Sequence, residues 1–387
     1  MVMYFRCGSV IHACPPSSDV FSIKFFDVRA NPLHPPLVAT YVPSRKPHEM
    51  FLWLDPKNPA RALLWISTPT SSANPDVANM LITDISRARE AVFTEIAKGN
   101  WNQFYPGSAN PANYDFDLAL HSMTPSVDGT RTYLAMLRGH FLILDTSDVA
   151  RGNLPQNGVL SLNDKLLTPV ENRPRWGTAD GGCLQACAES HSAVPVPGRP
   201  FALDIDEVYG KFTVASFGCP WGWARLITTA NPAQPRIIGE YRLAANNLSF
   251  CGSAGDDPAT EQFTSYSSHN PTLTRDLVLE AWHSGGLQAF DIEDPGHPTQ
   301  AGWFSPTPLA SVATEDPALS RGPNKVVMWS FPIVKDGLIY VVDIRNGLYI
   351  LRYSGPHAGE VTGLHYLEGN SNLGDAARID KSASDPS

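Results

Sequence analysis

The chain has 387 residues, a net charge of −9 and only 17% charged residues, and it contains 34 Pro and 29 Gly. So much Pro and Gly excludes a helical bundle, because Pro removes a helical hydrogen bond and Gly weakens helices. The negative charge argues against a nucleic-acid groove, which needs Lys and Arg against phosphate. No apolar run approaches the roughly 18 residues of a membrane span.

The N-terminal segment and the cysteines bear on the cellular compartment. Residues 1–16 lack the basic, apolar and small-residue order of a signal peptide. An even number of cysteines nevertheless fits disulfides in an oxidising compartment. We therefore expect a secreted or cell-envelope protein with a shortened N-terminus, and buried free thiols in a cytoplasmic protein are the alternative. The pair Cys219–Cys251 is the predicted disulfide among Cys7, Cys14, Cys183, Cys187, Cys219 and Cys251.

A strand of apolar residues that ends in Asp, or in an equivalent residue, recurs along the chain. The copies cover residues 22–27, 80–84, 141–145, 224–228, 287–291 and 348–352. They lie about 60 residues apart with one longer interval, which is the pattern of a repeat architecture. Several copies are followed by an Asn-Pro or Asp-Pro turn and a second strand, as at Asn231-Pro232 and Asp294-Pro295.

Units of about 60 residues with four short antiparallel strands are typical of propeller blades. We predict an all-β protein made of a single β-propeller of six or seven four-stranded blades that spans residues 1–387. The first blade is expected to begin at about residue 20 and to lack its innermost strand, and the tail 370–387 is expected to be disordered. Two tandem sandwiches are a poorer fit, because their strands need not share a turn sequence.

Two segments resemble a known family. Residues 282–295 and 336–353 are similar to the repeat of LVIVD-repeat β-propellers, and the likeness extends from about residue 20 to 370. Residues 278–304 are more distantly similar to the selenium-binding protein and methanethiol oxidase family, which also consists of propellers. The chain has His283 at the matching histidine but lacks the Cys-rich segment of selenium binding. Because methanethiol oxidases are copper enzymes, this likeness implies copper.

Four repeats begin their innermost strand with a histidine, namely His48, His121, His191 and His269, and the sixth repeat has Trp329 there. Inner strands splay from the propeller axis, so equivalent side chains near its narrow end converge. Neutral imidazole is a good ligand for copper, iron, nickel and zinc. We therefore predict that these histidines bind a transition metal, copper first and then iron. A structural ring, in which each histidine bonds a neighbouring blade, is the alternative.

Two further residues are predicted to act in catalysis. Glu207 follows the predicted strand 200–205, and His283 follows the equivalent strand 276–282 of the next repeat. Both are therefore expected on the channel rim. His283 could be a ligand or a proton donor, and carboxylates could orient ligand imidazoles. Glu49 and Glu189, which lie near two of the histidines, are candidates for the same orienting role. For each carboxylate, a solvent-facing loop position is the alternative.

Together these patterns indicate a transition-metal-dependent oxidoreductase that acts on a small molecule in the central channel. The alternative is a non-catalytic, exported propeller that binds a protein or a glycan through its loop face. Neither function involves nucleic acid or a membrane span. The two hypotheses differ in one geometric requirement, because only the first needs the histidine nitrogens at about 2.0–2.3 Å from a common point.

Overall fold

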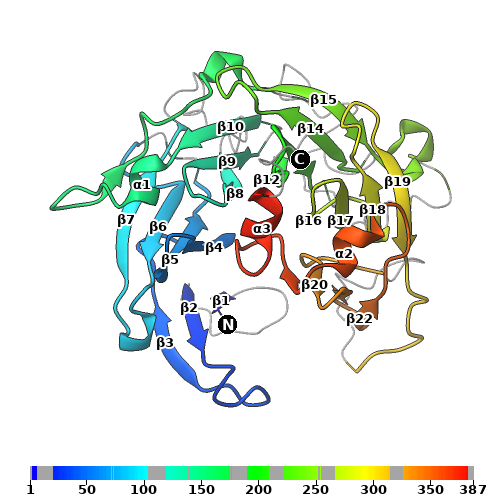
Figure 1. The fold of residues 1–387 in the computed structure, drawn as a ribbon, viewed down its shortest axis with the longest axis horizontal. Helices are drawn as coiled ribbons and strands as arrows, with labels where there is room; N and C mark the ends of the chain where they lie inside the picture. Colours follow the sequence, from blue (N-terminus) through cyan, green and yellow to red (C-terminus); the bar gives the residue numbers. More distant parts are fainter. Residues whose placement is uncertain are drawn as a thin grey trace.

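The computed structural model describes most of the chain as a ring of small sheets (Figure 1). The described part comprises residues 21–70, 72, 74–102, 119–137, 140–174, 176, 190–208, 221–251, 253, 266–313 and 326–381, together with the backbone of residues 2–6. Within it the strands form six sheets that follow one another around a common axis. The fold is therefore an all-β propeller, as the repeats predict.

The first three sheets contain the strands up to residue 161. The first sheet consists of β1 (Val2–Arg6), β2 (Phe21–Phe26) and β3 (Leu37–Tyr41). The second has β4 (Met50–Asp55), β5 (Asn58–Ser67), β6 (Met80–Asp84) and β7 (Thr94–Gly99), with β11 (Leu160–Ser161) parallel to β7. The third has β8 (Leu120–Pro125), β9 (Arg131–Met136) and β10 (His140–Asp145).

The last three sheets have four strands each. The fourth sheet contains β12 (Ser190–Pro195), β13 (Phe201–Asp206), β14 (Ala224–Thr228) and β15 (Arg236–Tyr241). The fifth contains β16 (Asn270–Leu273), β17 (Leu277–Trp282), β18 (Gly286–Asp291) and β19 (Thr299–Phe304). The sixth has the order β22-β21-β20-β23, with β20 (Ile333–Lys335), β21 (Leu338–Asp343), β22 (Gly347–Leu351) and β23 (Tyr366–Leu367).

Helices are few and short in the described residues. The α-helices are α1 (Ser147–Arg151), α2 (Ala358–Thr362) and α3 (Ala376–Lys381). The 3₁₀ helices are η1 (Ala88–Glu90), η4 (Val170–Asn172), η5 (Ala244–Asn246) and η6 (Leu248–Phe250). None of the described helices is long and apolar enough to cross a membrane.

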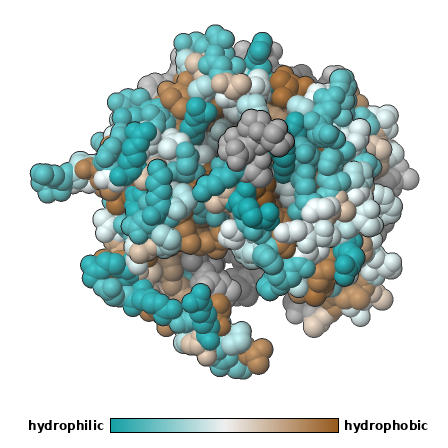
Figure 2. All heavy atoms as spheres, viewed as in Figure 1, coloured by the Kyte–Doolittle hydropathy of each residue, from teal (hydrophilic) through white to brown (hydrophobic). Residues whose placement is uncertain are grey.

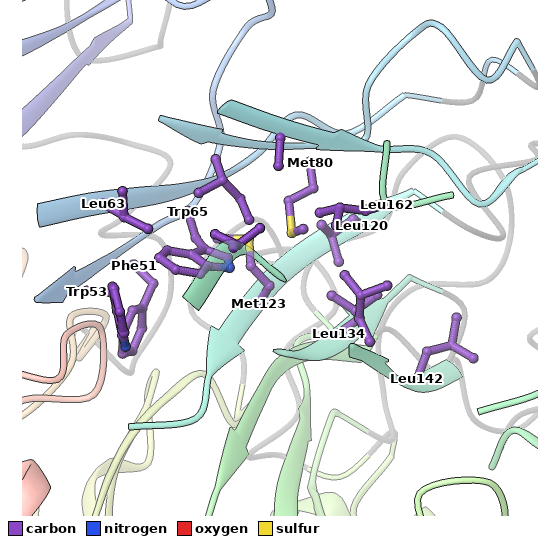
Figure 3. Close-up of a cluster of buried hydrophobic side chains, with 14 of the residues drawn as sticks. Phe51, Trp53, Leu63, Trp65, Met80, Leu120, Met123, Leu134, Leu142 and Leu162 are labelled. Atoms are coloured by element: carbon purple, nitrogen blue, oxygen red, sulfur yellow. The ribbon is translucent and has the colours of Figure 1, made fainter. Parts of the chain in front are cut away.

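The hydrophobic core lies between neighbouring sheets rather than at the axis. The largest cluster joins the second and third sheets and includes Trp53 and Trp65, which are both fully buried (Figure 3). A blade buries its two faces only against its neighbours, so a strand in the middle of a blade is apolar on both sides. This accounts for β17, in which all six residues are buried.

The first sheet differs from the fully four-stranded ones. Its three strands have the order β1-β2-β3, and β1 pairs antiparallel with β2, so the N-terminal residues 2–6 add to this blade upstream of residue 20. The sequence also allows a seventh blade in residues 153–182, and in the described part of that interval the only strand is the two-residue β11. The blade number, six or seven, remains a prediction.

The C-terminal segment crosses the centre of the ring, where α3 lies with its hydrophilic side outward (Figures 1 and 2). The predicted disorder of the tail from residue 370 is thus wrong for residues 370–381. Ser371 forms a parallel bridge with Leu52 in the innermost strand β4. The Asn372 side-chain amide accepts a hydrogen bond from Leu54 N and donates one to Leu54 O, and Ile379 is buried in a hydrophobic cluster that includes residues of the fifth and sixth sheets. These contacts order the segment because they satisfy its polar groups and cover apolar surface.

Candidate metal centre

The structure brings the four predicted histidines together at the starts of successive innermost strands. His48 precedes β4, His121 and His191 lie at the second positions of β8 and β12, and His269 directly precedes β16. Neighbouring ring centroids are 4.4 Å apart for His48 and His121, 3.9 Å for His121 and His191, and 4.3 Å for His191 and His269. Trp329 continues the series, 4.6 Å from the ring of His269. Equivalent repeat positions therefore do converge.

Glu207 and His283 complete the cluster. Glu207 directly follows β13, and His283 directly follows β17, so they occupy equivalent positions in neighbouring blades. Glu207 Oε1 lies 3.1 Å from His283 Nε2 and 3.2 Å from His269 Nε2. Glu207 Oε2 lies 3.4 Å from His191 Nε2. One carboxylate thus faces three imidazoles from two blades.

Backbone carbonyl groups determine the tautomers of two of the rings. His121 Nδ1 lies 3.2 Å from the carbonyl oxygen of His191, and His269 Nδ1 lies 2.5 Å from that of Trp329. A carbonyl oxygen only accepts hydrogen bonds, so each ring donates through Nδ1–H. In the neutral imidazole the lone pair then lies on Nε2, the nitrogen that faces the centre of the cluster.

A side-chain relay orients the third ring in the same way. His191 Nδ1 lies 2.8 Å from the Ser192 hydroxyl, and that hydroxyl donates to Asn270 Oδ1 at 3.4 Å. Because the serine proton is directed to Asn270, its oxygen accepts from His191 Nδ1–H. His191 therefore also presents the Nε2 lone pair. Hydrogen bonds of this kind, from the far nitrogen of a ligand histidine to an acceptor, are typical of metal sites.

Burial sets the charge of the cluster. His191, His269 and His283 are at most 1% exposed, and Glu207 is 7% exposed. Desolvation lowers the pKa of His269 to about 4 and that of His283 to about 3, and it holds the pKa of His121 and of His191 well below the usual value. Desolvation also raises the pKa of Glu207 to about 7. The imidazoles are therefore neutral at pH 7, the form that binds metals.

The donor set fits a metal ion. When Glu207 is ionised, the lone pair of His269 Nε2 faces a carboxylate oxygen, so two acceptors lie against each other, and Glu207 Oε1 is buried without a hydrogen-bond partner in the described residues. Two ligands of a tetrahedral ion with bonds of about 2.0–2.1 Å are roughly 3.3 Å apart, close to the distances found here. A cation would satisfy both acceptors. Two sets of residues have ligand atoms close to one another. One set is His121, His191 and Glu207, and the other is Glu207, His269 and His283.

His48 and Glu49 lie at the edge of this cluster. His48 is exposed, belongs to neither set, and has its Nε2 2.7 Å from Nε2 of His121. Glu49 lines a small cavity together with Ser122 and Ser192. Desolvation by burial, and then the charge of Glu207, raise the pKa of Glu49 to about 7. Glu189, the other predicted orienting carboxylate, lies outside the described residues.

His283 has an unusual backbone conformation. Its φ is 25°, in the region that residues other than glycine rarely adopt, and its carbonyl oxygen accepts a hydrogen bond from Met328 N at 3.1 Å. Its ring stacks on Trp329 with a centroid distance of 4.6 Å and an interplanar angle of 9°. Strained residues persist where the surrounding structure holds them, often at functional sites. The stacking of Trp329 on His283 was not predicted, although the place of Trp329 in the repeat series is a signal of its position beside the histidines.

The predicted disulfide is not tested by the described residues. Cys251 is the only cysteine among them and is not a free thiol, whereas Cys219 lies outside them. The pairing Cys219–Cys251 therefore remains a prediction.

The fold and the cluster together define a β-propeller with a buried His/Glu cluster that could bind a metal. No protein-family model matches the chain, and no curated protein matches it. Among solved structures, the chain is similar to the β-propeller domain of Cps50 (Swd1) from Myceliophteria thermophila, with 9% identity, a TM-score of 0.45, and 86% of this chain and 78% of that chain covered.

Two other solved propellers show a comparable likeness. A putative 6-phosphogluconolactonase from Bacteroides uniformis is 12% identical with a TM-score of 0.40, over 87% of this chain and 77% of that chain. Sqt1 from Chaetomium thermophilum is 10% identical with a TM-score of 0.39, over 89% of this chain and 66% of that chain. At such identities and scores, these comparisons carry no argument about function.

Proposed function

We propose that the protein is an LVIVD-type propeller with a transition-metal centre in its channel, and that it acts as an oxidoreductase on a small molecule. The observation that carries the proposal is the convergence of neutral imidazole Nε2 atoms and the Glu207 carboxylate in a buried site. Copper and iron are the proposed metals, because imidazole suits both and both change oxidation state. When bound, such an ion would transfer electrons between a reduced small molecule and dioxygen.

The protein side chains have separate tasks in this proposal. His121, His191 and His269 are ligands whose Nδ1–H donors keep the Nε2 lone pairs directed inward. His48 is the ligand at the exposed end of the site. Glu207 supplies the negative charge that offsets the metal charge in a buried place. His283 and Glu207 are also placed to give or take a proton beside the ion.

The channel favours entry of the substrate from the side of His48. His48 is exposed, whereas the opposite side of the cluster leads into a small cavity lined by Gly369 and Asn370 of the C-terminal segment. Hydrogen bonds from Leu52 N to Asn370 O and from Asn372 N to Leu52 O hold this segment across the inner strands. A substrate that approaches along the axis would therefore reach the ion past His48.

The experiment that tests the proposal is the metal content of untagged protein, measured by elemental mass spectrometry after incubation with copper or iron salts. We expect at least one bound ion per chain in the parent and less bound metal in a folded His121→Ala/His191→Ala variant, which loses two of the predicted ligands. The matched control is His34→Ala/His297→Ala, which removes two exposed histidines outside the cluster. A parent that binds neither metal would refute the proposal, and a channel without metal would favour the alternative of a non-catalytic binding protein.

A further inference from the structure

The two oxygens of Glu207 face different histidines. Oε2 lies 3.4 Å from Nε2 of His191, on one side of the carboxylate. Oε1 lies 3.2 Å from Nε2 of His269 and 3.1 Å from Nε2 of His283, on the other. A carboxylate that served one ion through one oxygen would leave its second oxygen without a role in the site. Here each oxygen has its own nitrogen partners.

The possible ligand atoms accordingly fall into two sets that share one member. His121, His191 and Glu207 form the first set, and Glu207, His269 and His283 form the second, with ligand atoms within 4.8 Å of one another in each. His48 Nε2, 2.7 Å from His121 Nε2, extends the first set toward solvent. Each set therefore offers two imidazoles and one carboxylate oxygen, which is a sufficient protein ligand set for one ion with an open position.

We propose that the cluster binds two divalent first-row transition-metal ions, bridged by the Glu207 carboxylate. The first ion is held by His121 and His191 at the His48 side, and the second by His269 and His283 beside Trp329. This inference rests on the proposed function of the cluster as a metal centre and adds the number and arrangement of the ions. It also makes His283 a metal ligand and Glu207 the bridge.

The position of each side chain supports this arrangement. Glu207 and His283 end equivalent strands in neighbouring blades, so a carboxylate from the fourth sheet meets imidazoles from both the fourth and the fifth sheets. Two-metal sites in other enzymes have ions about 3.5–4 Å apart, which a bridging carboxylate can span. The four imidazoles favour transition metals over Mg²⁺ and Ca²⁺, which prefer oxygen ligands. A ligand that fits such a pair is a small molecule with an oxygen atom able to contact both ions.

The number of bound ions distinguishes this inference from the proposed function. Metal-free full-length protein is titrated with Cu²⁺, and the bound copper is measured after removal of excess metal. Two ions per chain support the bridged pair. One ion per chain overturns the pair and leaves a single-metal centre, whereas no bound ion refutes both the pair and the proposed function.

A magnetic measurement tests the bridge itself. Two Cu²⁺ ions joined by a carboxylate couple their spins, so the paramagnetic resonance signal should integrate to well below two spins per chain. Glu207→Gln removes the charge and one of the two oxygen ligands, and we expect it to bind at most one ion and to restore the signal of an isolated Cu²⁺. The matched control is Glu280→Gln, which replaces a buried glutamate that bonds Tyr241. A full two-spin signal in the parent with two bound ions would overturn the bridge.

Single-histidine variants test the assignment of ligands to the two ions. His283→Gln and His121→Gln are each expected to lose one ion and to retain the other. Loss of all metal from either variant, or retention of both ions by either, would overturn the assignment, provided that circular dichroism shows the variant to be folded. If a variant fails to fold, the copper count and the spin count of the parent protein still decide the proposal.

Discussion

Glu207 Oε1 lies 3.1 Å from His283 Nε2, although the two residues belong to different blades. The contact forms because each residue directly follows the second strand of its sheet, so the propeller symmetry places them side by side. Sequence repetition alone would suggest like residues at these positions. The chain instead has a carboxylate at one and an imidazole at the other, a combination that suits a metal ligand set. A ring of histidines with a purely structural role would not require a carboxylate at one of these equivalent positions.

Trp329→Ala is expected to weaken metal binding. The indole stacks on His283 with an interplanar angle of 9°, and such aromatic pairs contribute about 0.5–1.5 kcal/mol, which corresponds to a roughly twofold to twelvefold loss of affinity. Calorimetric titration of metal-free protein with Cu²⁺ measures the effect. Trp329→Phe should retain most of the affinity, and Trp303→Ala, on an exposed residue of β19, should change nothing. Equal losses in all three variants would contradict the orienting role.

Glu280 is expected to make the protein less stable as the pH rises. Its side chain is fully buried, and desolvation raises its pKa from 4.5 to about 8, while the hydrogen bond from Tyr241 opposes this shift. Between pH 4.5 and about 8 the folded state binds more protons at this group than the unfolded state, so the free energy of unfolding falls with pH, by up to a few kcal/mol. Glu280→Gln should flatten this dependence in urea titrations at pH 5 to 8.

Tyr241→Phe provides the paired test of the same buried group. The Tyr241 hydroxyl donates to Glu280 Oε2 at 2.6 Å, and its loss removes a bond that favours the ionised carboxylate. The pKa of Glu280 should rise further, so the decline in unfolding free energy with pH should extend to higher pH, with the same slope below about pH 7 because one group can release only one proton. A variant with the same pH dependence as the parent would show that the pair does not control this titration.

Asn372→Ala is expected to lower the free energy of unfolding by about 1–3 kcal/mol. The side chain accepts from Leu54 N at 2.7 Å and donates to Leu54 O at 2.8 Å, so the substitution removes two hydrogen bonds between the C-terminal segment and strand β4. Chemical denaturation measures the difference. Asn31→Ala, in an exposed turn, should cost less than about 0.5 kcal/mol. Similar costs for both variants would argue against a stabilising role of the C-terminal segment.

Gly369→Ala should also destabilise the C-terminal segment. A Cβ atom at this position would lie 2.0 Å from the carbonyl oxygen of Pro271, so one of the two backbones would have to move. Overpacking of this kind costs about 1–3 kcal/mol, measurable as a lower melting temperature. Gly359→Ala is the matched control, because nothing lies within 4 Å of its Cβ and it is in helix α2. The control should be neutral or slightly stabilising.

Much of the fold and part of the site could be predicted from the sequence. A repeat of strands with a common turn predicts a ring of similar sheets, and the same alignment identified His48, His121, His191 and His269 as equivalent residues. Their convergence follows because equivalent residues of a propeller lie at the same height and distance from the axis. The position of Trp329 in that series was visible in the same alignment, but its stacking on His283 was not.

Other features depended on contacts between segments far apart in the chain. The tautomers of the histidines are set by carbonyl groups and a hydroxyl relay that are in place only when neighbouring blades are packed together. Residues 370–381 are ordered by hydrogen bonds to β4 of the second sheet, a contact between segments more than 300 residues apart. Local sequence patterns determine strands and repeat positions, because these depend on neighbouring residues. Charge states, ligand orientation and the position of the C-terminal segment were decided by burial and by the partners that only the folded ring supplies.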